Sequence, residues 1–140
     1  MARRKAREVA LKVLFQMDLG RHTLEEAWPL AIEGEGLPAG SAEFARELAA
    51  GSTCHREDID RLLSECSEGW KVNRMPGVDR NILRLAAYEL LHRADIPASA
   101  TINEAVELAK LYGTEESPRF INGVLGELAR RLGRVPAPAG

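Results

Sequence analysis

Apolar residues recur every three or four positions along almost the whole chain, and this spacing limits the fold more than any other feature. It produces one apolar stripe over 3–19, a wider one over 78–93 and another over 117–132. Side chains at this spacing share one face of an α-helix, which then packs against a core. No segment alternates β-branched and polar residues as a half-buried strand does. The sequence therefore predicts an all-α fold of about six or seven helices.

Local signals indicate where helices begin in the N-terminal half. Thr23 and Glu26 form the pattern of a capping box ahead of a short helix. Ser41 follows a Gly-rich stretch and is expected to cap the next helix. Residues 66–77 lack a helical period and end in Met-Pro-Gly. We expect that stretch to be irregular, with Trp70 as its anchor.

Similar signals occur in the C-terminal half. Thr101 and Glu104 form a second capping-box pattern, and the helix that follows is expected to bury Tyr112 with the other apolar side chains of its face. Ser117, followed by a proline, is typical of a helix start. These signals predict two further helices after the apolar segment 78–93.

The length of 140 residues fits one domain. We expect this domain to cover 1–133, with an N-terminal helical half of about 1–77, a C-terminal helical half of about 78–133, and a disordered tail at 134–140. No apolar run approaches the ~20 residues of a membrane span, and charged residues interrupt the N-terminal region, which argues against a signal peptide. Two cysteines are too few for a disulfide framework, so the sequence indicates a reducing, cytoplasmic setting.

Charge is distributed unevenly along the chain, although the formal net charge is only −2. Residues 1–21 hold six basic and two acidic side chains, residues 22–70 hold three and eleven, and residues 71–140 hold ten and eight. The ends are therefore basic and the middle is acidic. Because electric fields in salt act within a Debye length of about 8–10 Å, a basic end can attract a polyanion or can simply be solvated.

No pattern in the sequence demands an enzyme. The three histidines, His22, His55 and His92, are scattered and have no cysteine or carboxylate partner at metal-ligand spacing. The stretch 34–39 fits a Gly-x-Gly-x-x-Ala pattern, but no strand precedes it and it contains a proline, so it is a loop rather than a dinucleotide site. We predict no catalytic, cofactor-binding or metal-binding residue.

The remaining candidate for function is a cluster of cations at the start of the first expected helix. The cluster consists of Arg3, Arg4, Lys5 and Arg7. Cations oppose the helix dipole at this end at a cost of about 0.3–1 kcal/mol each, which contact with a nucleic-acid backbone would offset. Single-stranded RNA also needs aromatic surfaces for its bases, and Phe15 and Phe120 are candidates. The same residues also fit a solvated helix end and two core phenylalanines.

Two long segments contain distinctive sequence runs. The first is ARRKAREVALKVLFQMD at 2–18. The second covers 78–129, in which INEAVELAK at 102–110 and FINGVL at 120–125 are the most specific runs. Together these segments resemble the NusB family of transcription antitermination factors. The resemblance covers nearly the whole chain and is looser over about 20–77.

The resemblance implies a helical RNA-binding factor of the bacterial cytoplasm rather than an enzyme. Such factors pair with NusE, a small-subunit ribosomal protein, and bind the single-stranded boxA element of ribosomal RNA leaders. They then join an antitermination complex of RNA polymerase. Some of them form homodimers. By position, the family's RNA-binding residues fall on Arg3, Arg4, Lys5, Arg7, Phe15, Asp79, Glu116 and Phe120. Phe15 stands where relatives can have Tyr, so it can stack on a base but cannot donate a hydrogen bond. Glu116 stands where Asp also occurs.

Two other interpretations remain open. Ribosomal RNA cytosine methyltransferases carry a NusB-like N-terminal domain, but such a chain would continue into a catalytic domain, and this sequence contains no cofactor loop. Alternatively, the chain is a protein-interaction module whose basic end binds an acidic protein. In the antitermination interpretation, the acidic middle is a plausible docking face for the basic ribosomal protein.

Overall fold

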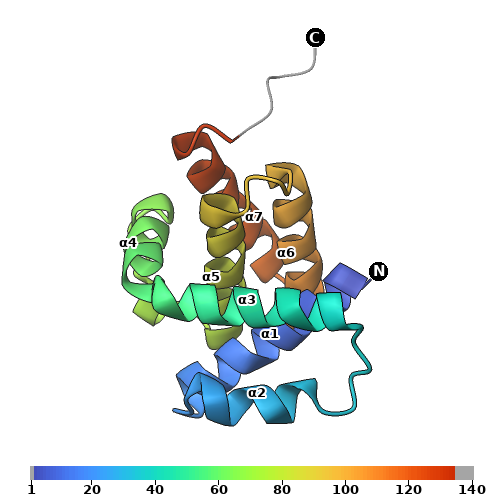
Figure 1. Cartoon of the computed structure of the whole chain (residues 1–140). Coiled ribbons are helices and arrows are strands. Elements are labelled where there is room, and N and C mark those ends of the chain that lie inside the picture. The colour runs from blue at the N-terminus through green and yellow to red at the C-terminus, as the bar shows by residue number, and fades with distance from the viewer. Residues whose placement is uncertain (1, 135–140) are drawn as a thin grey trace.

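The computed structural model describes residues 2–134, and within that range it contains seven α-helices, one short 3-10 turn and no strand (Figure 1). The all-α prediction is therefore confirmed. The elements are α1 (Ala2–Leu19), α2 (Leu24–Ile32), α3 (Ala39–Cys54), α4 (Arg56–Cys66), η1 (Val72–Arg74), α5 (Gly77–His92), α6 (Ala98–Tyr112) and α7 (Ser117–Arg131). The predicted disordered tail lies outside the described residues from position 135 onward.

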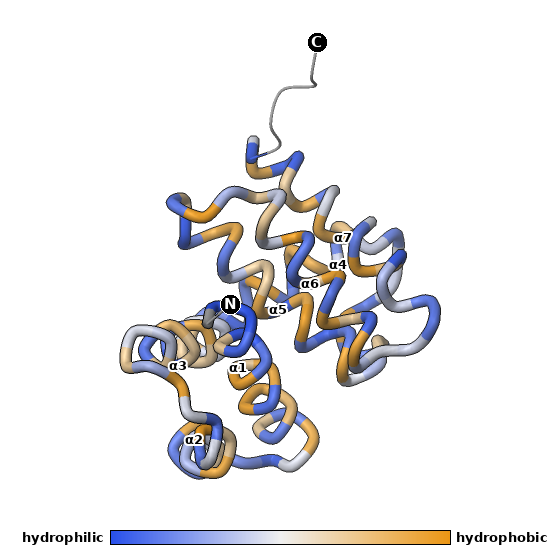
Figure 2. The backbone as a smooth tube through the Cα atoms, turned by 90° about the vertical axis from the view of Figure 1, so that its right-hand side faces the viewer, coloured by the Kyte–Doolittle hydropathy of each residue, from blue (hydrophilic) through white to orange (hydrophobic). Residues whose placement is uncertain are grey.

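Helix α5 lies in the middle of the fold. It packs against α1, α3, α4, α6 and α7, and side chains on most of its surface are buried, among them Ile82, Leu83, Leu85 and Leu90. This burial explains why its apolar stripe is wider than those of the other helices. In Figure 2, α1, α2 and α3 form one group and α4 to α7 form the other.

Helix α1 joins the two groups because it packs against α2, α3 and α5. Its predicted apolar stripe is buried, with Ala6, Val9, Ala10 and Val13 fully inaccessible to solvent. The division of the chain near residue 77 stays a prediction, and the packing runs across that point, since α4 contacts both α5 and α7.

The charged side chains buried along α5 are hydrogen-bonded, and Arg84 and Glu89 each have a partner of opposite charge. Arg84 donates to both carboxylate oxygens of Asp60, at 2.8 and 2.9 Å. Glu89 accepts two hydrogen bonds from Arg7 and one from the hydroxyl of Thr101. Because an unpaired buried charge costs several kcal/mol, these pairs hold α1, α4 and α6 at defined positions on α5. No fully buried side-chain nitrogen or oxygen among residues 2–134 lacks a hydrogen-bond partner.

One of the predicted capping boxes is confirmed and the other is wrong. The Thr23 hydroxyl accepts from the backbone N–H of Glu26, and the Glu26 carboxylate accepts from the backbone N–H of Thr23. Helix α6, in contrast, begins after Pro97, before the predicted Thr101 cap. Thr101 therefore lies inside the helix and points to Glu89. The predicted Ser41 cap is wrong for the same reason.

Helix α3 begins after Pro38, and Ser41 is buried in its first turn. Proline suits the start of a helix because its φ is already near the helical value. The predicted anchor at Trp70 is also wrong, since Trp70 is 55% exposed and the buried side chains of that stretch are Val72 and Met75.

Candidate nucleic-acid interface

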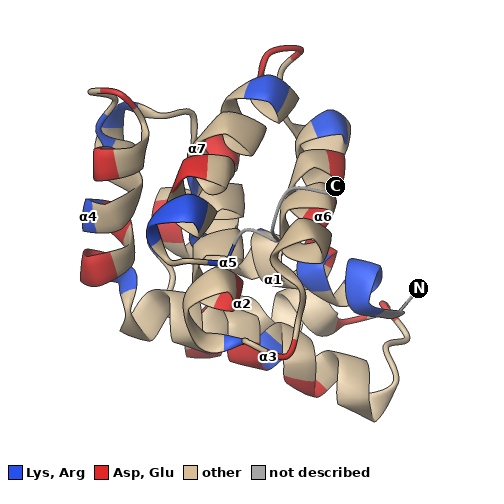
Figure 3. Ribbon diagram, turned by 90° about the horizontal axis from the view of Figure 1, so that it is seen from above, with Lys and Arg blue, Asp and Glu red and all other residues tan. Residues whose placement is uncertain are grey.

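Basic residues gather at the N-terminal end of α1 (Figure 3). Two of these cations, Arg4 and Lys5, are about half exposed, and each is paired with a carboxylate from another part of the chain. Arg4 donates to both carboxylate oxygens of Glu104 on α6, at 2.9 and 2.8 Å. The ammonium of Lys5 lies 3.0 Å from Glu35, in the loop before α3. These hydrogen bonds raise the pKa of Arg4 and of Lys5, so both are cations at neutral pH. Both side chains are about half exposed, where an ion pair adds little stability and exchanges readily.

Arg3 and Arg7 point toward α3 instead. Their guanidinium carbons lie 4.8 and 5.4 Å from the ring centroid of Phe44. Arg3 is exposed. Arg7 is only 6% exposed and donates to both oxygens of Glu89, at 2.8 and 2.7 Å. Because its charge is neutralised in the interior, Arg7 has no accessible face for a phosphate, and the accessible cations of the predicted cluster are the other three.

Phe15 and Asp79 lie near the opposite end of α1. Leu19, one helical turn after Phe15, fills the space where Gly77 has no side chain, which brings this end of α1 to the start of α5. Phe15 is partly exposed, whereas Asp79 is only 4% exposed. Burial raises the pKa of Asp79, and the hydrogen bond that its Oδ1 accepts from the hydroxyl of Ser117, at 2.7 Å, opposes that rise.

The turn between α6 and α7 connects Asp79 to the surface. Ser117 is the first residue of α7 and also accepts a hydrogen bond from the backbone N–H of Thr114, at 2.9 Å. Glu116 precedes it and is exposed. Asp79 therefore supports the turn from beneath, while Glu116, like the neighbouring Glu115, is presented to solvent.

Phe120 lines an open groove of about 540 Å³ between α7 and the segment that follows α4. Trp70 and Arg119 line the same groove. Phe120 is partly exposed and Trp70 is 55% exposed, so aromatic surface in this groove is available to a ligand. Phe15 and Phe120 are thus neither fully buried core residues nor free surface residues.

Tyr112 is an aromatic residue that the sequence analysis placed in the core, and this prediction is wrong. The side chain is 43% exposed, and its hydroxyl donates to Glu8 on α1 at 2.8 Å. Tyr112 continues the spacing of Ala105 and Ala109, which explains the error. Its position in the last turn of α6, before a glycine, is the one sequence signal that it lies at an edge. The Glu8 contact ties this edge to the basic helix α1.

Two further properties of the described residues bear on function. No group of three or more His, Cys, Asp or Glu side chains within 2–134 is arranged to hold a metal ion. No helix in that range is both long enough and apolar enough to cross a bilayer.

His55 and His92, which are far apart in sequence, stack with ring centroids 4.4 Å apart, so these two histidines are not scattered in space.

The fold and this surface together define a small helical protein with exposed cations at one end of α1 and exposed aromatic side chains near its other end and near α7. The model of the NusB family matches residues 4–130, and the chain belongs to this family. The resemblance noted in the sequence is thereby confirmed.

Curated relatives and solved structures agree with this assignment. The chain is 50% identical over 132 residues to the transcription antitermination protein NusB of Heliobacterium modesticaldum, covering 94% of this chain and 64% of that protein. It is 51% identical over 128 residues to the NusB of Desulforamulus reducens, covering 91% of this chain and 90% of that protein. T. maritima NusB superposes with a TM-score of 0.86 at 43% identity, covering 91% and 90% of the two chains.

A second solved structure places a relative in a complex. The chain superposes with a TM-score of 0.86, at 27% identity, on a chain from a crystal structure of antitermination factors NusB and NusE with dsRNA. The match covers 93% of this chain and 97% of that chain. In that assembly, a member of the same family is bound with both a protein and an RNA.

Proposed function

We propose that this protein is a transcription antitermination factor of the bacterial cytoplasm. In this proposal it binds single-stranded boxA-type RNA together with NusE and joins the antitermination complex of RNA polymerase. The family assignment carries the proposal, since relatives about half identical over most of the chain are named transcription antitermination proteins. The crystal structure of NusB and NusE with dsRNA supports NusE and RNA as partners, and the single-stranded boxA-type RNA is our proposal.

The proposed RNA surface consists of Arg3, Arg4, Lys5, Phe15, Tyr112, Glu116 and Phe120. The three cations neutralise phosphates, so affinity falls as salt concentration rises. The aromatic rings stack on bases, and this stacking adds affinity without selecting a particular base. Glu116 accepts hydrogen bonds from base amino groups and thus contributes to sequence choice. Asp79 and Arg7 act from inside, by fixing the α6–α7 turn and the start of α1.

Binding RNA in this way requires an exchange of partners at the start of α1. Arg4 and Lys5 must leave Glu104 and Glu35 for phosphates, or share their hydrogen bonds with both. Because the two cations are about half exposed, the exchange costs less than at a buried pair. The carboxylates also repel a backbone that approaches in the wrong register, which favours one path for the strand.

We place the NusE contact on the acidic middle of the chain. Helix α4 and the residues just after it expose Glu57, Asp58, Glu65 and Glu68. This charge suits a basic ribosomal protein. Reversing two charges, Glu57→Lys with Asp58→Lys, should weaken NusE binding measured by calorimetry and leave the binding of RNA alone unchanged. NusE affinity equal to that of the unmodified protein would remove α4 from the contact.

The decisive experiment measures fluorescence anisotropy of a labelled boxA-type RNA, with and without NusE, at low and moderate salt. A scrambled RNA and an Arg4→Ala/Lys5→Ala variant are titrated in parallel, and Arg21→Ala/Arg74→Ala serves as a control that removes two exposed cations outside both α4 and the proposed RNA surface. Specific binding that NusE strengthens, and that only the first variant weakens, supports the proposal. Equal affinity for scrambled RNA, even with NusE, would refute the boxA assignment and favour a protein-interaction module.

A further inference from the structure

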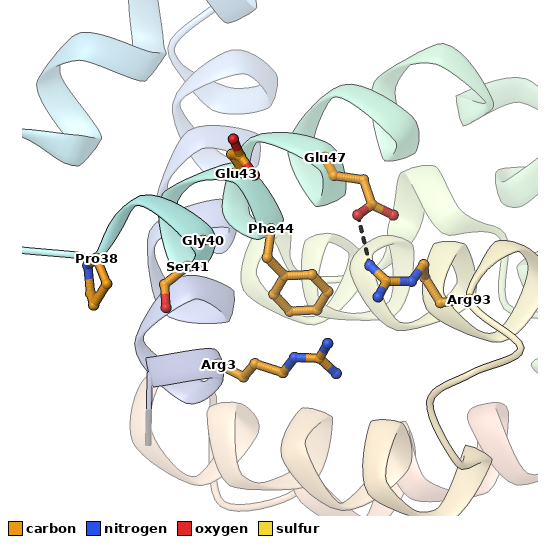
Figure 4. Close-up of a pocket in the computed structure, with 8 residues that line it drawn as sticks. All are labelled: Arg3, Pro38, Gly40, Ser41, Glu43, Phe44, Glu47 and Arg93. Atoms are coloured by element: carbon orange, nitrogen blue, oxygen red, sulfur yellow. Dashed lines mark hydrogen bonds and ion pairs between the residues drawn. The ribbon is translucent and has the colours of Figure 1, made fainter.

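An open groove of about 490 Å³ lies between the N-terminal ends of α1 and α3 (Figure 4). Arg3, Gly40, Ser41 and Phe44 line it. None of the partners described above for Arg4 or Lys5 lies in this groove. It therefore adds a separate feature to the basic end of α1.

The N-terminus of α3 opens into this groove with free backbone donors. The first helical hydrogen bond of α3 runs from the N–H of Ala42 to the carbonyl of Pro38, at 2.9 Å. The N–H groups of Ala39, Gly40 and Ser41 precede that bond, and Pro38 supplies no side-chain cap. A Cβ atom at Gly40 would meet nothing within 4 Å, so no side chain covers the surface beside Gly40 in this first turn. Helix N-termini of this kind attract anions.

Ser41 gives a second and independent indication of a ligand. The residue is 9% exposed, yet its hydroxyl makes no hydrogen bond with any residue from 2 to 134 that has a described side chain. In Figure 4 the hydroxyl points from α3 into the groove, on the side of Arg3. Because no buried side-chain oxygen among residues 2–134 lacks a partner, this hydroxyl is open to the groove and can donate to an acceptor there.

Arg3 supplies a positive charge that no described carboxylate neutralises by direct contact. Its guanidinium is held beneath the ring of Phe44, 4.8 Å from the centroid. Arg93, on the same groove, is already paired with Glu47 at 2.7 Å and with Asp95 at 2.9 Å. Glu43 also lines the groove, with its side chain turned away from Arg3 in Figure 4. Three kinds of group in the groove therefore have no hydrogen-bond or ion-pair partner among the described residues. They are the Arg3 guanidinium, the Ser41 hydroxyl and the N–H groups at the start of α3.

We propose that this α3 groove binds a phosphate of the RNA strand, one that lies just outside the boxA core held by Arg4, Lys5 and the aromatic residues. The phosphate oxygens accept from Arg3, from the Ser41 hydroxyl and from the Gly40 and Ser41 N–H groups. The inference rests on the proposed RNA-binding function, and it assigns the strand a path around the start of α1 toward α3. It extends the binding surface to a helix whose sequence carries no basic cluster.

In the first test, inorganic phosphate is titrated into the isotope-labelled full chain, and binding is monitored by NMR through the shifts of the backbone amide resonances. Saturable shifts are expected at the amides of Gly40 and Ser41, and Ser41→Ala should weaken this binding at least threefold. Gly40→Asp places a carboxylate in the first turn of α3, where it interacts favourably with the helix dipole and competes with the phosphate, so it should abolish the shifts without unfolding α3. No saturable shift at these amides, or equal binding in Gly40→Asp, would overturn the proposal.

The second test distinguishes a phosphate of RNA from a free ion. The shortest RNA that shows full boxA specificity is lengthened by one nucleotide at a time at each end. One extension should raise affinity about three- to fivefold, as expected for one phosphate contact at a partly exposed site. Ser41→Ala and Gly40→Asp should lose that gain and bind the core RNA as the unmodified protein does. The matched control is Ser99→Ala, an exposed serine on α6.

The possible failures are distinct. If the core RNA itself binds no better than a scrambled RNA, the proposed function fails, whatever phosphate does at α3. If the core binds specifically but no extension gains affinity through Ser41, then shifts with inorganic phosphate reveal an adventitious ion only, and the RNA path toward α3 is wrong.

Discussion

Two arginine–glutamate pairs lie one helical turn apart on α1 and have almost the same geometry. Arg4 meets Glu104 at 2.9 and 2.8 Å, and Arg7 meets Glu89 at 2.8 and 2.7 Å. Their environments differ, since the side chain of Arg4 is 51% exposed and that of Arg7 is 8% exposed. The exposed pair can release its arginine to a ligand, whereas the buried pair is part of the core. Distance alone therefore does not reveal the role of an ion pair, but burial does.

The largest effect expected from this comparison is on stability. Glu89→Ala leaves the Arg7 charge buried without a partner and removes the acceptor of Thr101. We expect the free energy of unfolding to fall by about 3–5 kcal/mol, measured by urea denaturation. Replacing both partners, Arg7→Met with Glu89→Leu, should recover most of the loss, because no charge then remains buried.

Glu104→Ala is the matched control for that prediction, because it breaks a pair of the same geometry at the surface. Its unfolding midpoint should lie close to that of the unmodified protein. If Glu89→Ala and Glu104→Ala lowered the midpoint equally, burial would not separate the two pairs, and the structural role given to Arg7 would be wrong.

The difference between the two pairs also shows what sequence can and cannot predict. Helical spacing correctly predicts the all-α fold and the buried stripe of α1, because packing follows local periodicity. It treats Arg3, Arg4, Lys5 and Arg7 as one cluster, because their partners come from elements distant in sequence. A signal for the buried pair was nevertheless present. Glu89 follows Ile82 and Ala86 at helical spacing, so it falls on the buried face of α5 and requires a cation there.

Other errors share this physical cause. Thr101 and Ser41 match the residue type of a helix cap, but a proline upstream starts each helix earlier. Their hydroxyl groups then serve the interior or a groove. The Asp79–Ser117 contact joins residues 38 positions apart. No local pattern reports such a contact, and only the family resemblance had singled out Asp79.

The contrast between exposed and buried side chains extends to the phenylalanines and predicts the next largest effect. Phe44 is 7% exposed, whereas Phe120 is partly exposed in a groove with Trp70. Phe120→Ala should weaken binding of boxA-type RNA by about 1–3 kcal/mol if the ring stacks on a base, measured by anisotropy. Phe120→Leu keeps the apolar contact and should lose most of the same affinity. Unchanged affinity in a folded Phe120→Ala protein would remove the ring from the RNA surface.

A smaller effect on RNA binding is expected when either residue of the exposed Arg4–Glu104 pair is replaced. Arg4→Ala should reduce the slope of log affinity against log salt by about 0.7, the value for one phosphate contact on a single strand, and should leave the urea midpoint unchanged. Glu104→Gln removes the competing carboxylate, so RNA affinity should rise. If Glu104→Gln weakened RNA binding, Arg4 would depend on Glu104 for its position, and the exchange of partners would not occur.

The smallest effect is on the pH dependence of stability, and it concerns Asp18 and Asp79, two aspartates where α1 meets α5. Burial would raise the pKa of Asp18, but hydrogen bonds from Arg80 and Asn81 outweigh it and the pKa is lowered. Burial raises the pKa of Asp79, and the Ser117 hydrogen bond offsets this only in part. Stability from Asp18 is thus present above the ordinary aspartate pKa of about 3.9 and is lost as pH falls, whereas stability from Asp79 is greatest below that value and is lost as pH rises through its raised pKa.

The two asparagine variants should therefore respond to pH in opposite ways. Asp79→Asn imitates the protonated form and can still accept from Ser117, so its melting temperature at pH 7 should equal or slightly exceed that of the unmodified protein, with the difference vanishing near pH 3. Asp18→Asn should melt lower at pH 7, with a deficit that narrows as the pH falls. A melting temperature of Asp79→Asn well below that of the unmodified protein at pH 7 would show that the charged carboxylate, not its desolvation, dominates at the α6–α7 turn. Asp79 would then belong with Arg7 and Glu89, as a buried charge that the fold requires.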